Sequence, residues 1–420
     1  MLNTMPSVKK FYVAFWILHC VLFFIGFYPM LMHPIQHMYF NEGDGIKNYF
    51  TLISYIKQPA SHGLFHYTAM QYPYGDYIYF TDNSPLLAML MRMFSLYITD
   101  TSNYAIVIMH AFIMLNMVLV PFIIWKILKK FTTNGWILLA GTLWLTWVTP
   151  QFIRIFSSTY NLSFSIFYFL AILAAIQIVE AYYENNRKKL LLNCIIIFLT
   201  IFSASFIHLY YILMLGLPAG FFMILHSILH AKNFIKRIQY FILPIFTLFC
   251  CAVCVIGVIS ATDVYKDLRL TVPEGSDIRE YEVQFDSLYK TKHGYNTLQF
   301  IGGTAGYGGE QSIFMGNFFF YGISLLTLYY LYARFKLKKK ISVSASEKKL
   351  LLLFLISALI SYFSACGDWL EFGRSNTRYD NYLNPLFHIE KFYPAIDQFR
   401  YLCRIGWWFY YMFQFVFLIL

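Results

Sequence analysis

Two carboxylates, Glu42 and Asp44, stand on either side of a single glycine, and Asp44 lies twelve residues after the first hydrophobic stretch ends at residue 32. A carboxylate in this place is suited to act as a general base that removes the proton of an attacking hydroxyl. Asp44 also directly precedes a segment of helical periodicity, so a helix N-cap is its structural alternative. The residues leave both roles open, with Asp44 ahead of Glu42 as candidate base.

Two further aspartates follow in the same loop. Asp76 ends the segment 72–76, and Asp82 opens the segment Asp82-Asn83-Ser84-Pro85. Both segments are rich in turn-forming residues, which favours a turn or cap role for each aspartate. Asp82 is therefore the third candidate for the catalytic carboxylate.

Three arginines are candidates for binding an anion. Arg154 lies in the segment 150–161, where hydroxyl and amide side chains follow it, and it suits either an interfacial anchor or a phosphate contact. Arg400 and Arg404 are four residues apart and would share one helix face. Like charges on one face repel unless an anion lies between them, so this pair indicates a phosphate site.

His208 and Tyr210 stand in a short polar and aromatic segment, 208–211, between two hydrophobic stretches. This segment is either an ordinary turn at the membrane interface or part of the pocket that holds a donor molecule.

The elements that must position these residues are membrane helices. The chain of 420 residues is 59% hydrophobic and only 13% charged, and apolar runs long enough to cross a bilayer recur along it. The runs are continuous rather than alternating, which predicts an all-α polytopic protein and not a barrel. Ten spans are expected, near 11–32, 104–128, 135–152, 161–180, 190–207, 209–229, 239–261, 314–334, 349–366 and 406–420.

Charge sets the expected orientation. Eighteen of the 32 Lys and Arg residues lie at the N-terminus or in the short loops after even-numbered spans, whereas only Glu180, Glu184 and Glu347 are acidic on that side. This bias predicts a cytoplasmic N-terminus and three outer loops, 33–103, 262–313 and 367–405. The net charge of +11 thus reflects basic residues gathered in the loops on one side of the membrane, and it does not indicate nucleic-acid binding. The short cytoplasmic loops leave no room for a nucleotide-binding domain.

The first outer loop has two predicted helices. Apolar residues at helical spacing from Ile46 to Ile56 indicate an amphipathic helix along the membrane surface that ends before Pro59. Ser84 as N-cap and Pro85 at the first helical position begin a second helix that is too short to span.

This layout resembles the GT-C superfamily of membrane glycosyltransferases, which take a sugar from a polyprenyl-phosphate carrier. The resemblance lies in the acidic segment after the first span, the two helices of the first outer loop and the proline-led Ser84-Pro85-Leu86-Leu87. The segment 154–161 and the segment 399–404 resemble features of the YfhO-like bacterial branch. YfhO-like proteins continue into further spans, so this single membrane domain, 1–420, is expected to be a shortened version.

The resemblance implies a base at Asp44, with Glu42 second, and a carrier phosphate held by Arg154, Arg400 and Arg404. It also implies a bacterial cytoplasmic membrane protein whose active face points outward. Its partners would be the bilayer, a polyprenyl-phosphate-linked sugar and a cell-surface glycan, lipid or protein acceptor. No cofactor is identified, and a requirement for a divalent metal is left open.

Two other functions remain alternatives, namely a transporter or flippase for a lipid-linked glycan and a non-catalytic membrane assembly subunit. Away from the span ends, the main ionisable groups are His19, His110 and His226. Ion-coupled transport usually depends on charged groups inside the membrane, so their scarcity disfavours the transporter.

Overall fold

The computed structural model describes a largely helical chain. It describes residues 8–39, 44–156, 159–230, 234–268, 283, 317–336, 345–371, 378–390 and 402–419. The chain divides into two compact units, the first comprising Met1–Ile212 with Phe246–Val264 and the second Leu213–Ile245 with Tyr265–Leu420. Helix α10 (Phe234–Thr262) contributes to both units, and Pro244 lies inside it next to the division, where it removes one helical hydrogen bond.

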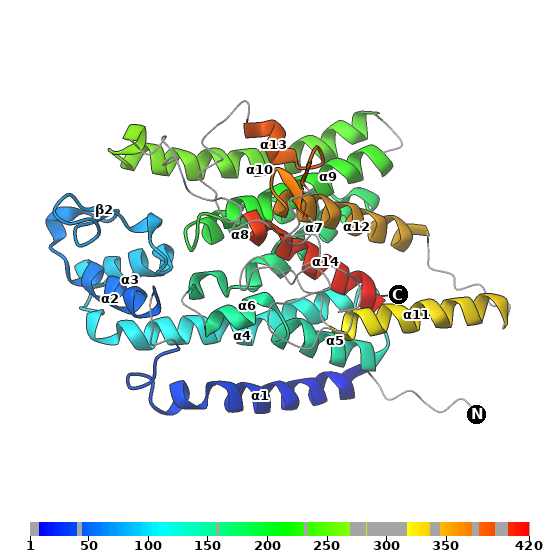
Figure 1. Cartoon of the computed structure of the whole chain (residues 1–420), viewed down its shortest axis with the longest axis horizontal. Coiled ribbons are helices and arrows are strands. Elements are labelled where there is room, and N and C mark those ends of the chain that lie inside the picture. Colours follow the sequence, from blue (N-terminus) through cyan, green and yellow to red (C-terminus); the bar gives the residue numbers. More distant parts are fainter. Residues whose placement is uncertain are drawn as a thin grey trace. The chain divides into compact units, whose positions relative to one another are not determined.

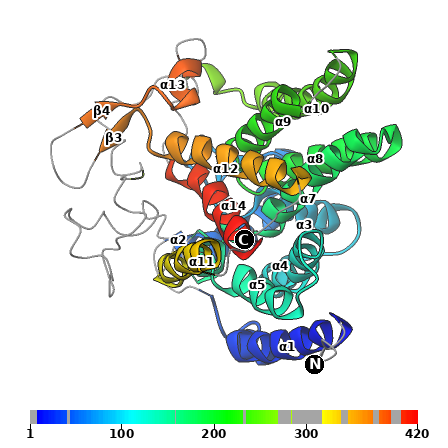
Figure 2. The ribbon, with the colours of Figure 1, turned by 90° about the vertical axis from the view of Figure 1, so that its right-hand side faces the viewer.

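The first unit is a layer of long apolar helices with a small cap at one end. Its helices are α1 (Val8–Met32), α2 (Asp44–Lys57), α3 (Pro85–Tyr97), α4 (Ala105–Leu128), α5 (Gly135–Trp147), α6 (Pro150–Ile155), α7 (Ile166–Tyr183) and α8 (Arg187–Ser205). Helix α4 packs against α5 and α7, α7 packs against α8, and α1 packs against α5 (Figure 2). Helices α2 and α3 gather at one end of α4, together with the hairpin that contains β2 (Figure 1).

The second unit is built around one central helix that packs against two others. Its elements are α9 (Leu217–His230), α11 (Asn317–Phe335), α12 (Ala345–Ala365), α13 (Pro385–Glu390) and α14 (Gly406–Ile419). Helix α12 packs against α9 and α14. The large rings of Trp407 and Trp408 are buried in this unit.

Strands are a minor part of the described residues and form two antiparallel pairs. In the first unit, β1 (His66–Tyr67) pairs with β2 (Asp76–Tyr77) so that His66 lies opposite Tyr77. In the second unit, β3 (Trp369–Glu371) pairs with β4 (Arg378–Asp380), with Leu370 opposite Tyr379. Neither pair is large enough to form a core, so the expectation of an all-α membrane protein is confirmed at this level.

Eight helical segments among the described residues are long and apolar enough to cross a membrane. They match eight of the ten expected spans, whereas α11 and α12 do not meet the same criterion. The apolar stretch of α12 identified among the described residues is Lys349–Ala365.

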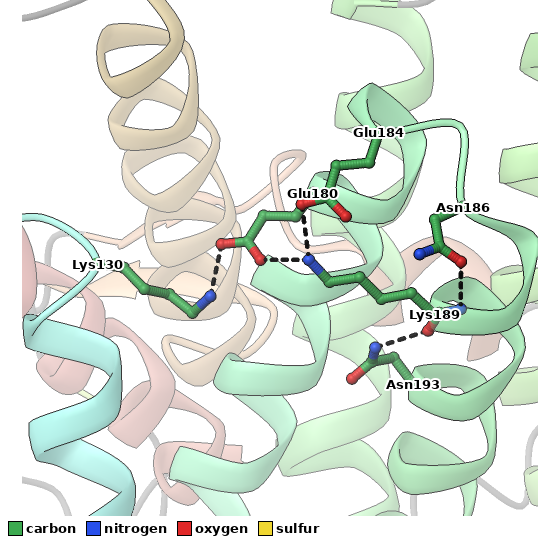
Figure 3. A network of polar contacts seen from close by, with 6 residues as sticks. All are labelled: Lys130, Glu180, Glu184, Asn186, Lys189 and Asn193. Carbon is green, nitrogen blue, oxygen red and sulfur yellow. Dashed lines mark hydrogen bonds and ion pairs between the residues drawn. The ribbon is translucent and has the colours of Figure 1, made fainter.

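An ion network fixes one end of the first unit (Figure 3). Glu180 of α7 accepts hydrogen bonds from Lys130 Nζ at 2.6 Å and from Lys189 Nζ at 2.8 Å. Lys189 also reaches Glu184 at 2.9 Å. Since Lys130 follows α4 and Lys189 begins α8, the loops 129–134 and 184–186 lie at the same end. We call this end the Glu180 end.

Because consecutive spans alternate in direction, α2, α3, α6 and the α8–α9 connection lie at the opposite end of the first unit. Direct contacts agree, since the Leu86 backbone amide at the start of α3 donates to the carbonyl of Phe206, just beyond α8. We call this the Asp82 end. This contact brings the first predicted outer loop and the α8–α9 connection together, as the alternation read from the basic loops predicts.

The first loop helix exists as expected, but its main apolar face does not lie outward. Tyr49, Leu52, Tyr55 and Ile56 are buried, and α2 packs against α3 and α4. Ile46 and Phe50 stay exposed, so only a narrow apolar edge of α2 is available to lipid. The helical spacing predicted the element, whereas packing against α3 decided which side is covered.

The charge bias yields a test of orientation. Ser61, exposed in the first loop, and Lys188, exposed at the Glu180 end, are each replaced by Cys. We expect an impermeant maleimide to label Ser61→Cys in intact cells and to label Lys188→Cys only after the membrane is opened, because basic loops are retained inside. The unsubstituted protein, measured in parallel, gives the background from its seven native cysteines. Labelling of Lys188→Cys in intact cells would show that the protein has the opposite orientation to the one predicted.

Candidate functional site

Asp82 lies in a tightly held turn between a 3₁₀ segment (Ile78–Phe80) and α3. The Thr81 hydroxyl, which has one proton to donate, lies 2.6 Å from both the Ile78 carbonyl oxygen and Asn83 Oδ1. Ser84 is the N-cap residue, as expected, but its side chain makes no capping bond, and its backbone is left-handed with φ of 56°. A non-glycine residue in this region is strained, and such strain gathers at functional sites. The strained backbone of Ser84 by itself therefore makes this turn a candidate functional site.

Asp82 meets His208 from the α8–α9 connection. The distance from Asp82 Oδ1 to His208 Nε2 is 3.6 Å. His208 Nδ1 accepts a hydrogen bond from the Tyr210 backbone amide at 3.2 Å, and the Tyr210 ring stands edge-on to the imidazole. An Nδ1 atom that accepts must lack a proton, so this bond assigns the neutral tautomer with hydrogen on Nε2. His208 then presents an N–H to the Asp82 carboxylate.

Lys47 supplies a cation on the other oxygen of the same carboxylate. Its Nζ lies 3.9 Å from Asp82 Oδ2, and the two side chains are 54% and 34% exposed. At this exposure the pair contributes at most about 1 kcal/mol to stability. Lys47 lies in the first turn of α2, so its ammonium remains accessible to an anionic ligand.

Hydroxyl groups extend the site along the Asp82 end. The Tyr160 side chain interacts with Ser84 and lies near enough to Asp82 to feel its charge. Next to it, Thr159 accepts a hydrogen bond from Arg154 Nη1 at 3.0 Å. The Thr149 hydroxyl caps α6, which carries Arg154, by accepting from the Phe152 amide at 3.1 Å. Arg154, Tyr160 and Asp82 are thus linked through contiguous segments of one unit.

Arg92 holds α2 and α3 together beneath the site. Its buried guanidinium donates to four backbone carbonyls, those of Tyr55, Gln58, Pro59 and Gly63, at 2.7–3.1 Å. These carbonyls belong to the C-terminal turn of α2 and the loop after it, where helical donors run out, although the Pro59 carbonyl also accepts from the His62 amide at 3.2 Å. Burial lowers the pKa of Arg92, and the nearby Tyr55 acts in the opposite direction.

A second buried contact fixes α2 to α4. The Tyr49 hydroxyl lies 2.6 Å from His110 Nε2 and accepts from the Tyr39 backbone amide at 3.1 Å. The Tyr49 hydroxyl therefore joins the Tyr39 backbone to the His110 ring of α4. Burial raises the pKa of Tyr49 above its ordinary value, so the hydroxyl stays protonated. Lys47, two residues earlier on α2, is positioned by this contact.

The structure brings some of the predicted site residues together. Asp82, His208 and Tyr210 form one cluster, and Arg154 lies at the same end of the same unit. Asp44 begins α2, one helical turn before Lys47. Glu42, Arg400 and the side chain of Asp44 lie outside the described residues.

Arg404 belongs to the second unit, where it is buried in the 3₁₀ segment Leu402–Ile405 before α14. Its pairing with Arg400 therefore stays a prediction. Sequence reasoning missed Lys47, Ser84 and Tyr160 as site residues. Signals were available for two of them, since Lys47 is three residues after Asp44 and Tyr160 lies in the polar segment that follows Arg154.

Neither a bound metal nor a cofactor is implied by the donor set that the structure describes. Among the described residues, no three His, Cys, Asp or Glu side chains group as a metal ion requires. Within this part of the chain the polar chemistry consists of a carboxylate, an imidazole, an ammonium, a guanidinium and hydroxyls. Such a set can accept a proton and bind an anion side by side.

Comparison with known proteins gives one match. The family described as "Domain of unknown function (DUF6311)" matches residues 16–420. No curated protein and no solved structure matches the chain.

Proposed function

Because the chain belongs to the DUF6311 family, whose description assigns no activity, we propose its function from its site: a membrane glycosyltransferase that moves a sugar from a polyprenyl-phosphate carrier to an acceptor hydroxyl. The observation that carries the proposal is the Asp82 carboxylate, partly exposed and 3.6 Å from the Nε2 of a neutral His208. At this distance the His208 Nε2–H faces the carboxylate without a direct hydrogen bond, and an ionised aspartate is the form that accepts a proton. Asp82 thereby takes the role of base that the sequence favoured for Asp44.

The chemistry follows from these positions. Asp82 accepts the proton of the acceptor hydroxyl while the oxygen attacks the anomeric carbon of the donor sugar. The bond between that carbon and the carrier phosphate breaks, and polyprenyl phosphate leaves with the bonding electron pair. His208 keeps the carboxylate oriented, and its Nε2–H balances part of the charge before transfer.

The leaving phosphate needs cations near the base. Lys47 and Arg154 are the described cations at the Asp82 end that meet this need, one on each of the two segments beside the turn. Arginine suits a phosphate because its planar donors can bond two oxygens at once. The Lys47 ammonium is a compact charge that can leave the Asp82 carboxylate and pair with the phosphate when the donor binds.

The location of the site supports a lipid-linked donor. The Asp82 end lies opposite the basic Glu180 end, so the proposed active face is the outer face of a bacterial cytoplasmic membrane. Nucleotide sugars are made in the cytoplasm, and an activated sugar on the outer face must arrive on a membrane carrier. The acceptor is then a glycan, lipid or protein of the cell surface.

A transfer assay tests the proposal. The purified protein in lipid nanodiscs is mixed with polyprenyl-phosphate-linked radiolabelled hexose and with membrane and cell-wall fractions as acceptors. We expect labelled sugar to appear on acceptor together with an equal amount of free polyprenyl phosphate. Movement of the intact lipid across proteoliposomes without cleavage would instead identify a flippase. Absence of both cleavage and movement would favour the assembly subunit.

A further inference from the structure

Two asparagines beside the site are buried without using their hydrogen-bonding capacity. Asn161 is fully buried, and neither its amide nitrogen nor its side-chain oxygen has a partner among the described residues. Asn83 is also fully buried; its oxygen accepts from Thr81, and its nitrogen has no partner in the same part of the chain. Buried amides are nearly always satisfied, so each such group requires an explanation.

Both amides belong to segments that form the site. Asn83 lies between Asp82 and Ser84, and Asn161 directly follows Tyr160, whose side chain interacts with Ser84. The Asn161 backbone carbonyl also accepts from the Tyr211 hydroxyl at 3.4 Å, which connects it to the His208 segment. The two unsatisfied amides therefore belong to the two segments that approach each other at the turn 82–84.

The turn that contains Asn83 is strained. Ser84 has its backbone in the left-handed region, and Asn83 precedes it. Displacement of the turn 82–84 would relieve this strain and expose Asn83 together with the neighbouring Tyr160–Asn161 segment. The same movement would admit a ligand next to Asp82.

We propose that Asn83 and Asn161 recognise the hydroxyl groups of a neutral sugar ring, with the turn 82–84 opening to admit it. An amide side chain offers both a donor and an acceptor, and a sugar hydroxyl is likewise both. The ionised Asp82 beside the amides disfavours an acidic sugar through like-charge repulsion. This inference rests on the proposed sugar transfer and adds the class of sugar and the residues that bind it.

A binding comparison isolates the sugar contribution. The affinity of the full-length protein in nanodiscs is measured for polyprenyl phosphate and for the same lipid carrying a neutral hexose. We expect the sugar-bearing lipid to bind about tenfold more tightly, as one or two hydrogen bonds provide. Asn161→Leu and Asn83→Leu should each reduce that preference by roughly three- to tenfold, with affinity for bare polyprenyl phosphate unchanged.

Thermal stability separates recognition from a folding defect. An unsatisfied buried amide is costly, so its removal should leave the melting temperature equal or higher. Asn161→Ala serves as a second variant if the larger Leu overpacks. Asn193→Leu is the matched control, because Asn193 is a buried asparagine at the Glu180 end whose nitrogen donates to the Lys189 carbonyl at 2.7 Å. Its lipid preference should equal that of the wild type.

These outcomes distinguish failure of this inference from failure of the proposed function. Equal affinity of the wild type for the two lipids, or an unchanged preference in folded Asn83 and Asn161 variants, would overturn the inference even if sugar transfer is found. A preference that both variants lose would support it, and a wild type that shows this preference but transfers no sugar would count against the proposed function and not against sugar binding by these two amides.

Discussion

Replacement of Asp82 by Asn is expected to reduce the rate of sugar transfer by about 100-fold or more, the range that a general base contributes. Asparagine keeps the shape of the side chain, and its amide oxygen can still face His208 Nε2, but it cannot take a proton from the acceptor. Donor affinity should change little, because the carboxylate serves the acceptor hydroxyl. Single-turnover transfer with a radiolabelled donor, and separate donor binding, measure the two effects.

Two identical substitutions elsewhere in the first loop serve as controls. Asp100→Asn alters a carboxylate that accepts from the Ser102 backbone amide at 2.8 Å, at the turn between α3 and α4, and it should retain transfer activity. Asp44→Asn tests the residue that the sequence favoured, and it keeps any helix cap because Asn caps as well as Asp. Full activity of Asp82→Asn with a large loss in Asp44→Asn would move the role of base to Asp44.

Replacement of Arg92 by Met is expected to cause the largest loss of stability among single changes at this end, about 3 kcal/mol or more. Each hydrogen bond to a charged group contributes about 1.5–3 kcal/mol, and Arg92 donates to four backbone carbonyls, of which the Pro59 carbonyl also accepts from the His62 amide. Met fills most of the buried stem, so the loss reports the guanidinium rather than a cavity. Thermal unfolding of the purified protein, and proteolysis of the loop after α2, measure it.

Arg92→Lys should fall between Met and wild type, since one ammonium cannot reproduce the planar fork that reaches four oxygens. Arg187→Met is the matched control, because Arg187 is exposed at the Glu180 end and its loss should stay within about 0.5 kcal/mol. A wild-type melting temperature for Arg92→Met would show that water replaces the guanidinium at these carbonyls without cost.

The sequence by itself determined the class of protein and most of its elements. Apolar runs identified eight spans that the structure contains, because length and hydropathy are local properties of a segment. Ser84-Pro85 identified the start of α3 for the same reason, since proline suits the first helical turn through its own geometry. The connection at 208–211 and the shared end of the basic loops were also readable, because alternation of spans fixes which loops lie together.

Only the tertiary structure showed which of the described carboxylates meets a residue from a distant segment. Asp76 and Asp82 look alike in the sequence as loop aspartates, but their partners differ. Asp76 uses its carboxylate to accept from the neighbouring Tyr77 amide, whereas Asp82 meets His208 because the start of α3 bonds to the end of α8. Pairing of this kind depends on packing between distant segments, and no local pattern encodes it. For the same reason, the sequence could not predict that the amides of Asn83 and Asn161 are unsatisfied. They are removed from water without a described partner only when the helices pack.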